Sequence, residues 1–282
     1  MKINKIPLLL LMLLAGFITA CSEEDENLDI PLPGLGGETW TKGTVDTWLD
    51  NNYVKPYNIE VKYRFDRYEL ALNKVLTPPR EDKVIPVMET IKKTWIEPYE
   101  QEGGADFIKR LSPKQFVLVG SAQYNSDGTI TLGTAEGGRK VVLYVINDFD
   151  KKNKPEVKQM LHTIEHEYGH ILHQTIMYPE EYKRVTTNYT ANWYDYSLAD
   201  ARSRGFIPEY ARNNPDDDFV EMISMMLIEG RTGFNAIVNS APASAQPLLK
   251  RKEELVVRYF KEAWNIDFYS LQTRAQAAIN AL

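Results

Sequence analysis

The pattern of apolar and polar positions predicts strands in the first half of the chain and helices throughout. Apolar residues alternate over 57–65, as in a half-buried strand, and short apolar runs over 115–121 and 140–147 predict two more strands. Another strand is expected at 129–134, after a turn at 125–128. Helical periodicity or a helix-start signal marks the segments 44–52, 67–76, 81–99, 153–177, a stretch from Pro215 onward and at least two helices within 241–282. The chain is therefore expected to be an α+β protein with a mostly helical C-terminal part.

The predicted helix over 153–177 carries the clearest chemical signal. All 4 histidines of the chain lie in it: His162, His166, His170 and His173. His166, Glu167 and His170 form an H-E-x-x-H motif, which places the two imidazoles one above the other on a single face. Two imidazoles in that arrangement can bind one tetrahedral zinc ion, with Glu167 beside them as a general base for a bound water.

A catalytic zinc site needs a third protein ligand. His173 lies about 5 Å beyond His170 by helical rise, too far for one ion to meet all three rings. His173 and His162 are therefore predicted either to support the site from outside the ligand set or to be structural residues. Downstream, Pro215 and the three aspartates after it predict a helix start, and Asp217 and Glu221 are four residues apart on one face. Capping of that helix is the simpler explanation for the aspartates and is expected of one of them, so the residues alone leave the third ligand open.

Composition adds few constraints. The 282 residues are 43% hydrophobic and 26% charged, which is ordinary for a globular protein with one large domain or two small ones. The net charge is -6 and no basic patch stands out, so a nucleic-acid partner is not expected. The sequence carries no signal for an oligomeric state.

Residues 1–20 are predicted to be a signal peptide. Lys2 and Lys5 precede an apolar run over 6–20 that is too short for a membrane span. The run ends at Cys21, the only cysteine of the chain, and Ile-Thr-Ala-Cys resembles a bacterial lipobox. That resemblance implies lipidation of Cys21, which anchors a protein to a membrane without spanning it. A plain secretory signal cleaved nearby is the alternative.

Residues 21–37 are predicted to be a flexible tether. They begin with an acidic run and continue through prolines and glycines that do not hold regular structure. The acidic run resembles the export signal after the lipidated cysteine in surface-exposed lipoproteins of Bacteroidetes-type bacteria. This resemblance implies a protein anchored to the outer membrane and facing outward, although a periplasmic orientation stays open. The folded domain is then expected to span residues 38–282.

Three segments carry a resemblance to a known family: PYNIEVKYRFD, HEYGHILHQ and GFIPEYARNNPDDDFVEMIS. They resemble the zinc-binding metallopeptidases found among Bacteroidetes lipoproteins, over most of the mature chain. The resemblance implies a zincin-like domain, in which a small mixed sheet packs on the H-E-x-x-H helix and one edge strand is open to a substrate backbone. It also implies one zinc ion per chain and a protein or peptide substrate.

The last segment also resembles a wider set of zincins that includes anthrax lethal factor. By that resemblance Tyr210 hydrogen-bonds the oxyanion, Asp217 ligates zinc and Glu221 orients a ligand. The usual third ligand in that group is glutamate, and Asp217 is one methylene shorter. Either the second helix comes closer to the first, or Glu221 takes the ligand role, or the site is weakened.

The expected function is a zinc-dependent peptidase, in particular an endopeptidase at the bacterial cell surface that cleaves peptide bonds with a metal-activated water. Asp217 in place of glutamate keeps an alternative open, namely a surface-binding lipoprotein that retains the zincin fold without turnover. A purely structural lipoprotein without metal is disfavoured by the four histidines beside Glu167. The aromatic and amide-rich stretch 186–196 is expected either to line a groove or to pack under the metal helix, and no catalytic role is assigned to it.

Overall fold

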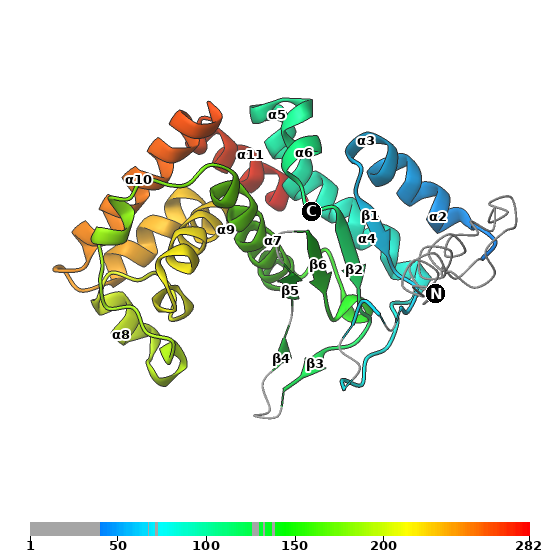
Figure 1. The fold of residues 1–282 in the computed structure, drawn as a ribbon, viewed down its shortest axis with the longest axis horizontal. Coiled ribbons are helices and arrows are strands. Elements are labelled where there is room, and N and C mark those ends of the chain that lie inside the picture. Colours follow the sequence, from blue (N-terminus) through cyan, green and yellow to red (C-terminus); the bar gives the residue numbers. More distant parts are fainter. Residues whose placement is uncertain (1–39, 67, 71–72, 126–129, 132, 137–138) are drawn as a thin grey trace, which may run out of the picture. The chain divides into compact units, whose positions relative to one another are not determined.

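Four short strands form a mixed sheet next to the long helices (Figure 1). Their order across the sheet is β1 (Glu60–Lys62), β2 (Gln115–Leu118), β6 (Lys140–Leu143) and β5 (Gly133–Glu136). The first three are parallel, whereas β5 pairs antiparallel with β6 and lies at an edge. A separate antiparallel pair, β3 (Gln123–Tyr124) and β4 (Ile130–Thr131), extends away from this sheet. The mixed sheet confirms the predicted α+β class.

The computed structural model describes residues 40–66, 68–70, 73–125, 130–131, 133–136 and 139–282. The predicted signal peptide, Cys21, the predicted tether and most of the predicted turn at 125–128 lie outside the described residues. From Lys42 to Leu282 the chain forms one compact unit. Within the described ranges, no helix combines the length and the apolar character needed to cross a bilayer.

The two central strands, β2 and β6, are buried on both faces. Alternate side chains of a strand point to opposite sides of the sheet. One face of β2 and β6 joins the main hydrophobic core through Phe116, Leu118, Val141 and Leu143. The other face covers a smaller apolar cluster that contains Val117, Val119, Val142 and Tyr144. Strands buried on both sides read as continuous apolar runs, which is why these two were visible in the sequence.

Helices lie before and after β1, the first strand of the sheet. α2 (Thr44–Leu49) continues through a π-helical segment into α3 (Lys55–Tyr57), so the predicted strand over 57–65 is reduced to β1. α4 (Glu81–Ile91) likewise continues through a π-helical segment into α5 (Glu97–Gly103), which matches the helix predicted from residue 81. The short helix α6 (Ala105–Leu111) was not predicted.

The helix expected over 67–76 is wrong. The described residues of that stretch form turns, bends and irregular structure, and the Asp66 side chain accepts a hydrogen bond from the backbone N–H of Tyr68 at 2.9 Å. An aspartate that binds the backbone two residues on stabilises a turn and competes with a helix. The apolar residues Leu70 and Leu76 instead pack against the smaller cluster beneath the sheet.

The rest of the chain is mostly helical, as predicted. Its helices are α7 (Lys154–Thr175), α8 (Leu198–Ser203), α9 (Pro215–Ser240), α10 (Gln246–Trp264) and α11 (Phe268–Asn280). α7 contacts β5 and β6 of the sheet and also α9. The sheet therefore packs on the H-E-x-x-H helix, as the fold prediction required.

α7 and α9 approach each other closely at Gly169. A Cβ atom at this position would lie 2.8 Å from Cγ1 and 2.9 Å from Cβ of Val220. A glycine in a helix costs about 1 kcal/mol relative to alanine, so its presence here is explained by the room it leaves for α9. The neighbour that needs this room is the Val220 side chain of α9.

We expect Gly169→Val to lower the free energy of unfolding by about 1–3 kcal/mol, since the added methyl groups overpack the helix crossing. Urea unfolding followed by circular dichroism measures this change. Gln174→Val, at an exposed position of the same helix, is the control for the β-branched side chain itself and should cost no more than about 0.7 kcal/mol. Equal losses in the two variants would contradict the close-crossing explanation.

α9 is interrupted at Gly230, which has a φ of 66°. The interruption removes the regular i to i+4 hydrogen bonds there, and carbonyls of the preceding turn need other donors. Gln272 on α11 donates to the carbonyl of Met226 at 2.6 Å, and Gln276 donates to those of Leu227 and Ile228 at 2.6 and 2.8 Å. Two glutamine amides of the last helix thus replace helical hydrogen bonds in α9.

Candidate metal centre

The orientation of α7 follows from its apolar stripe. The side chains of this stripe are buried: Val157, Leu161, Ile164, Tyr168 and Leu172. Pro155 occupies the first turn of the helix, and Asn153, the N-cap residue, makes no side-chain capping hydrogen bond. With the stripe fixed in the core, His166 and His170 face the start of α9.

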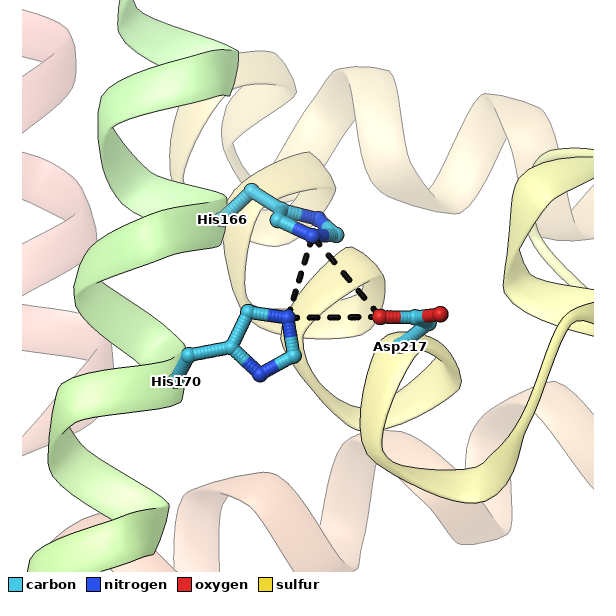
Figure 2. A group of neighbouring side chains, drawn as sticks. All are labelled: His166, His170 and Asp217. Carbon is cyan, nitrogen blue, oxygen red and sulfur yellow. Dashed lines mark hydrogen bonds and ion pairs between the residues drawn. The ribbon is translucent and has the colours of Figure 1, made fainter. Parts of the chain in front are cut away.

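Three side chains converge between α7 and α9: His166, His170 and Asp217 (Figure 2). Nε2 of His166 and Nε2 of His170 are 3.2 Å apart. Oδ1 of Asp217 lies 3.3 Å from Nε2 of His170 and 4.0 Å from Nε2 of His166. The structure therefore brings together the three residues that the sequence analysis put forward as metal ligands.

The spacing of these atoms fits a tetrahedral ion. Zinc bonds of about 2.0–2.1 Å to nitrogen and oxygen place neighbouring ligand atoms about 3.3 Å apart. Two of the three separations match this value, and the third is less than 1 Å longer. The donor set of two imidazoles and one carboxylate also belongs to the ligand sets of catalytic zinc sites. The residues present thus fit the ion.

Asp217 is held by amides on its far oxygen. Oδ2 accepts hydrogen bonds from Nδ2 of Asn213 at 2.6 Å and Nδ2 of Asn214 at 2.7 Å, which leaves Oδ1 directed at His170. Burial acts to raise the pKa of Asp217, but contacts with His170 and Asn213 outweigh it and lower the pKa. The carboxylate is therefore ionised, as a metal ligand must be.

Asn214 is the N-cap residue of α9. Its side-chain oxygen accepts from the backbone N–H groups of Asp216 and Asp217, both at 2.9 Å. The expectation that one of the aspartates caps this helix is wrong, because Asn214 is the N-cap residue. Asparagine is among the strongest N-cap residues, so the signal for this cap was present in the local sequence.

Glu221 lies on the other side of the His166 ring. Its carboxylate accepts from Nδ1 of His166 at 2.7 Å and from Nε2 of His162 at 2.9 Å. Burial opposes its ionisation, but the contacts with His162 and His166 prevail and lower its pKa to about 2. An anionic acceptor at Nδ1 fixes the proton there and leaves the Nε2 lone pair for a metal. This geometry favours Glu221 as a residue that orients His166 and Asp217 as the ligand.

His173 plays the equivalent part for His170. Its Nε2 lies 2.9 Å from Nδ1 of His170. Burial, together with the charge of His170, lowers the pKa of His173 to about 4, so its ring is neutral. Nε2 of His173 can then accept the Nδ1 proton of His170, which frees Nε2 of His170. Nδ1 of His173 is buried and has no hydrogen-bond partner among the described residues.

Glu167 and Tyr210 complete the candidate site. Glu167 is partly buried, and burial raises its pKa. The Tyr210 ring centroid lies 5.6 Å from that of His166 and 5.0 Å from that of Trp193, which packs edge-on against it. Burial and the nearby charge of Asp217 raise the pKa of Tyr210 to about 12, so the phenol keeps its proton. Trp193, from the aromatic stretch without an assigned role, thus borders the site.

Comparison with known proteins agrees with this geometry. A family model described as "Putative zinc-binding metallo-peptidase" matches residues 38–269. A crystal structure of a protein from Bacteroides caccae ATCC 43185, described in the same words, shares 33% sequence identity with a TM-score of 0.74, over 84% of this chain and 91% of that chain. No curated protein matches the chain. The resemblance found in the sequence is confirmed, and the chain belongs to the "Putative zinc-binding metallo-peptidase" family.

Proposed function

We propose that this protein is a zinc-dependent endopeptidase with one zinc ion per chain, held by His166, His170 and Asp217. The observation that supports it most directly is the convergence of two Nε2 atoms and one carboxylate oxygen at tetrahedral spacing, with Glu167 adjacent in sequence. When bound, zinc would supply a Lewis acid and lower the pKa of a water molecule towards neutrality.

The residues of the chain supply the proton transfer, the stabilisation of the oxyanion and the orientation of the ligands. Glu167 accepts a proton from the attacking water and passes it to the leaving amine of the peptide. Tyr210, protonated at neutral pH, donates a hydrogen bond to the oxyanion that develops on the carbonyl oxygen. Glu221 and His173 hold the two ligand imidazoles in the required tautomer.

β5 provides a place for the substrate backbone. Within the described part of the chain, this strand has no partner on its outer side, and its free N–H and C=O groups can pair with an extended peptide. A Cβ atom at Gly133 on β5 would lie 2.3 Å from Cγ2 of Thr163, so the strand runs directly over α7, three residues before His166. A peptide paired with β5 would therefore pass near the candidate metal centre.

The N-terminal segments supply the proposed location. Residues 1–20 would be removed as a signal peptide, Cys21 would carry the lipid, and residues 21–37 would serve as the tether of a domain over 38–282. The lipobox-like sequence and the acidic run after it support an outward-facing protein anchored to the bacterial outer membrane, where proteins or peptides are accessible as substrates. This proposal includes no nucleic-acid partner.

Removal and return of the metal test the activity. The purified protein loaded with zinc is expected to cleave a broad peptide mixture at internal bonds, to stop after dialysis against a chelator, and to recover when zinc is restored. Mass spectrometry of the products measures cleavage and shows the preferred positions. Cleavage that persists without metal would contradict the mechanism. A protein that binds zinc stoichiometrically but cleaves nothing would favour the alternative of a surface-binding lipoprotein, for which Asp217 in place of glutamate is the motivating feature.

A further inference from the structure

Helix α10 contributes a fully buried lysine to the interior of the molecule. Lys252 has no exposed surface, and its Nζ donates to Oδ2 of Asp218 at 2.6 Å and to the carbonyl of Gly205 at 2.8 Å. The Nζ also lies 4.4 Å from the ring centroid of Phe206. Removing an ammonium and a carboxylate from water is costly, and apolar residues of similar size would often serve stability as well. Stability alone therefore does not explain the buried ion pair of Lys252 and Asp218.

Asp218 directly follows Asp217 in the first turn of α9. The first turn of a helix lacks part of its backbone hydrogen bonds and moves easily unless other groups hold it. Here Asp218 is held at several points, since its Oδ2 also accepts from the Tyr189 hydroxyl at 2.9 Å and its carbonyl accepts from the Tyr182 hydroxyl at 3.0 Å. These contacts fix the helix turn that also carries Asp217, whose side chain faces His166 and His170.

The second acceptor of Lys252 lies in the connection that leads to Tyr210. Gly205 has a φ of 83°, and a Cβ atom there would lie 2.8 Å from Cβ of Leu248 on α10. The connection is therefore pressed against α10 at the point where Lys252 binds its carbonyl. One ammonium group links α10 both to this connection and to the first turn of α9.

We infer that Lys252 is a positioning residue for the metal centre, which acts on Asp217 through Asp218. This inference rests on the proposed role of Asp217 as a zinc ligand. It gives a function in the site to the C-terminal helices, for which the sequence showed no chemistry.

The zinc affinity of the folded protein tests the inference. It is measured by competition with a chromophoric chelator, in the absence of substrate. Lys252→Met keeps the length of the side chain but removes its charge and its donors. We expect its zinc affinity to fall about 10- to 100-fold, as for other losses of groups that orient metal ligands. Circular dichroism at the same temperature verifies that the variant is folded.

Leu271→Ala is the matched control. It removes a fully buried side chain from α11 and so destabilises the helical C-terminal part without any change in the contacts of Lys252 or Asp218. Its zinc affinity should stay within about twofold of the unchanged protein, since the residues that orient the ligands keep their partners. An unchanged affinity in Lys252→Met, or equal losses in both variants, would overturn the inference.

If Lys252→Met does not fold, Asp218→Asn tests the inference instead. This variant removes the negative charge that pairs with Lys252 but keeps an oxygen acceptor and the side-chain volume. We expect weaker zinc binding in this variant too, and wild-type affinity would overturn the inference. A protein that binds zinc with these responses but cleaves no peptide would refute the proposed peptidase activity and leave the role of Lys252 supported. A protein that binds no zinc would refute both.

Discussion

Replacement of Glu167 by glutamine is expected to reduce peptide hydrolysis by a factor of about 10² to 10⁴, with zinc binding retained. Glutamine has nearly the same shape but cannot accept a proton from water. The predicted ligands His166, His170 and Asp217 keep all their hydrogen bonds to other residues, because Glu167 takes part in none of them. The loss should therefore fall on kcat, with little change in KM or in zinc content.

Kinetics and metal analysis on the same sample check this expectation. Glu156→Gln is a suitable control, since it removes an exposed carboxylate from the first turn of the same helix. That variant should cleave at the wild-type rate. Wild-type activity in Glu167→Gln would show that another group moves the proton, and loss of zinc from it would show that Glu167 acts on the metal rather than on the water.

Removal of Asp217 should have the largest effect on the metal itself. In Asp217→Ala the predicted site keeps only two imidazoles, and we expect zinc affinity to fall by more than about 100-fold, beyond the loss caused by removing an orienting partner of a ligand. Glu221→Gln removes the anionic acceptor at Nδ1 of His166 but leaves all three converging atoms in place. We expect a smaller loss there, about 10- to 100-fold.

This pair of variants decides between the two carboxylates that the sequence left open. Competition with a chelator gives both affinities, and the order of the losses is the informative result. A larger loss in Glu221→Gln than in Asp217→Ala would assign Glu221 as the third ligand. It would also mean that zinc binding rearranges the ring of His166, whose Nδ1 faces Glu221.

The sequence predicted α7 and its motif well because the signals there are local. Apolar residues three and four positions apart define the buried face of a helix, and the same period places His166 and His170 together. The third ligand needed more than local rules, since Asp217 stands between two other aspartates in one helical turn. Only the spacing from Tyr210 in the wider family singled it out. The structure also explains how the shorter side chain of an aspartate reaches the site. Gly169 lets α9 approach α7 closely.

Other features depend on contacts between distant parts of the chain, which no local pattern encodes. The contacts of Lys252 with Asp218 and with the carbonyl of Gly205 belong to this class. The wrong helix over 67–76 had a local cause, because the turn at Asp66 outcompeted its helical periodicity. Short strands such as β1 were overestimated, since pairing with a neighbour, and not the apolar alternation, determines where a strand ends.

The interruption of α9 at Gly230 affects where the domain ends. The family match stops at residue 269, yet the glutamines that bind the carbonyls of α9 are Gln272 and Gln276. A chain shortened to the matched region would leave the carbonyls of Met226, Leu227 and Ile228 without these donors in the core. We therefore expect truncation at residue 269 to lower the free energy of unfolding, because the carbonyls of α9 would lose the donors that α11 supplies.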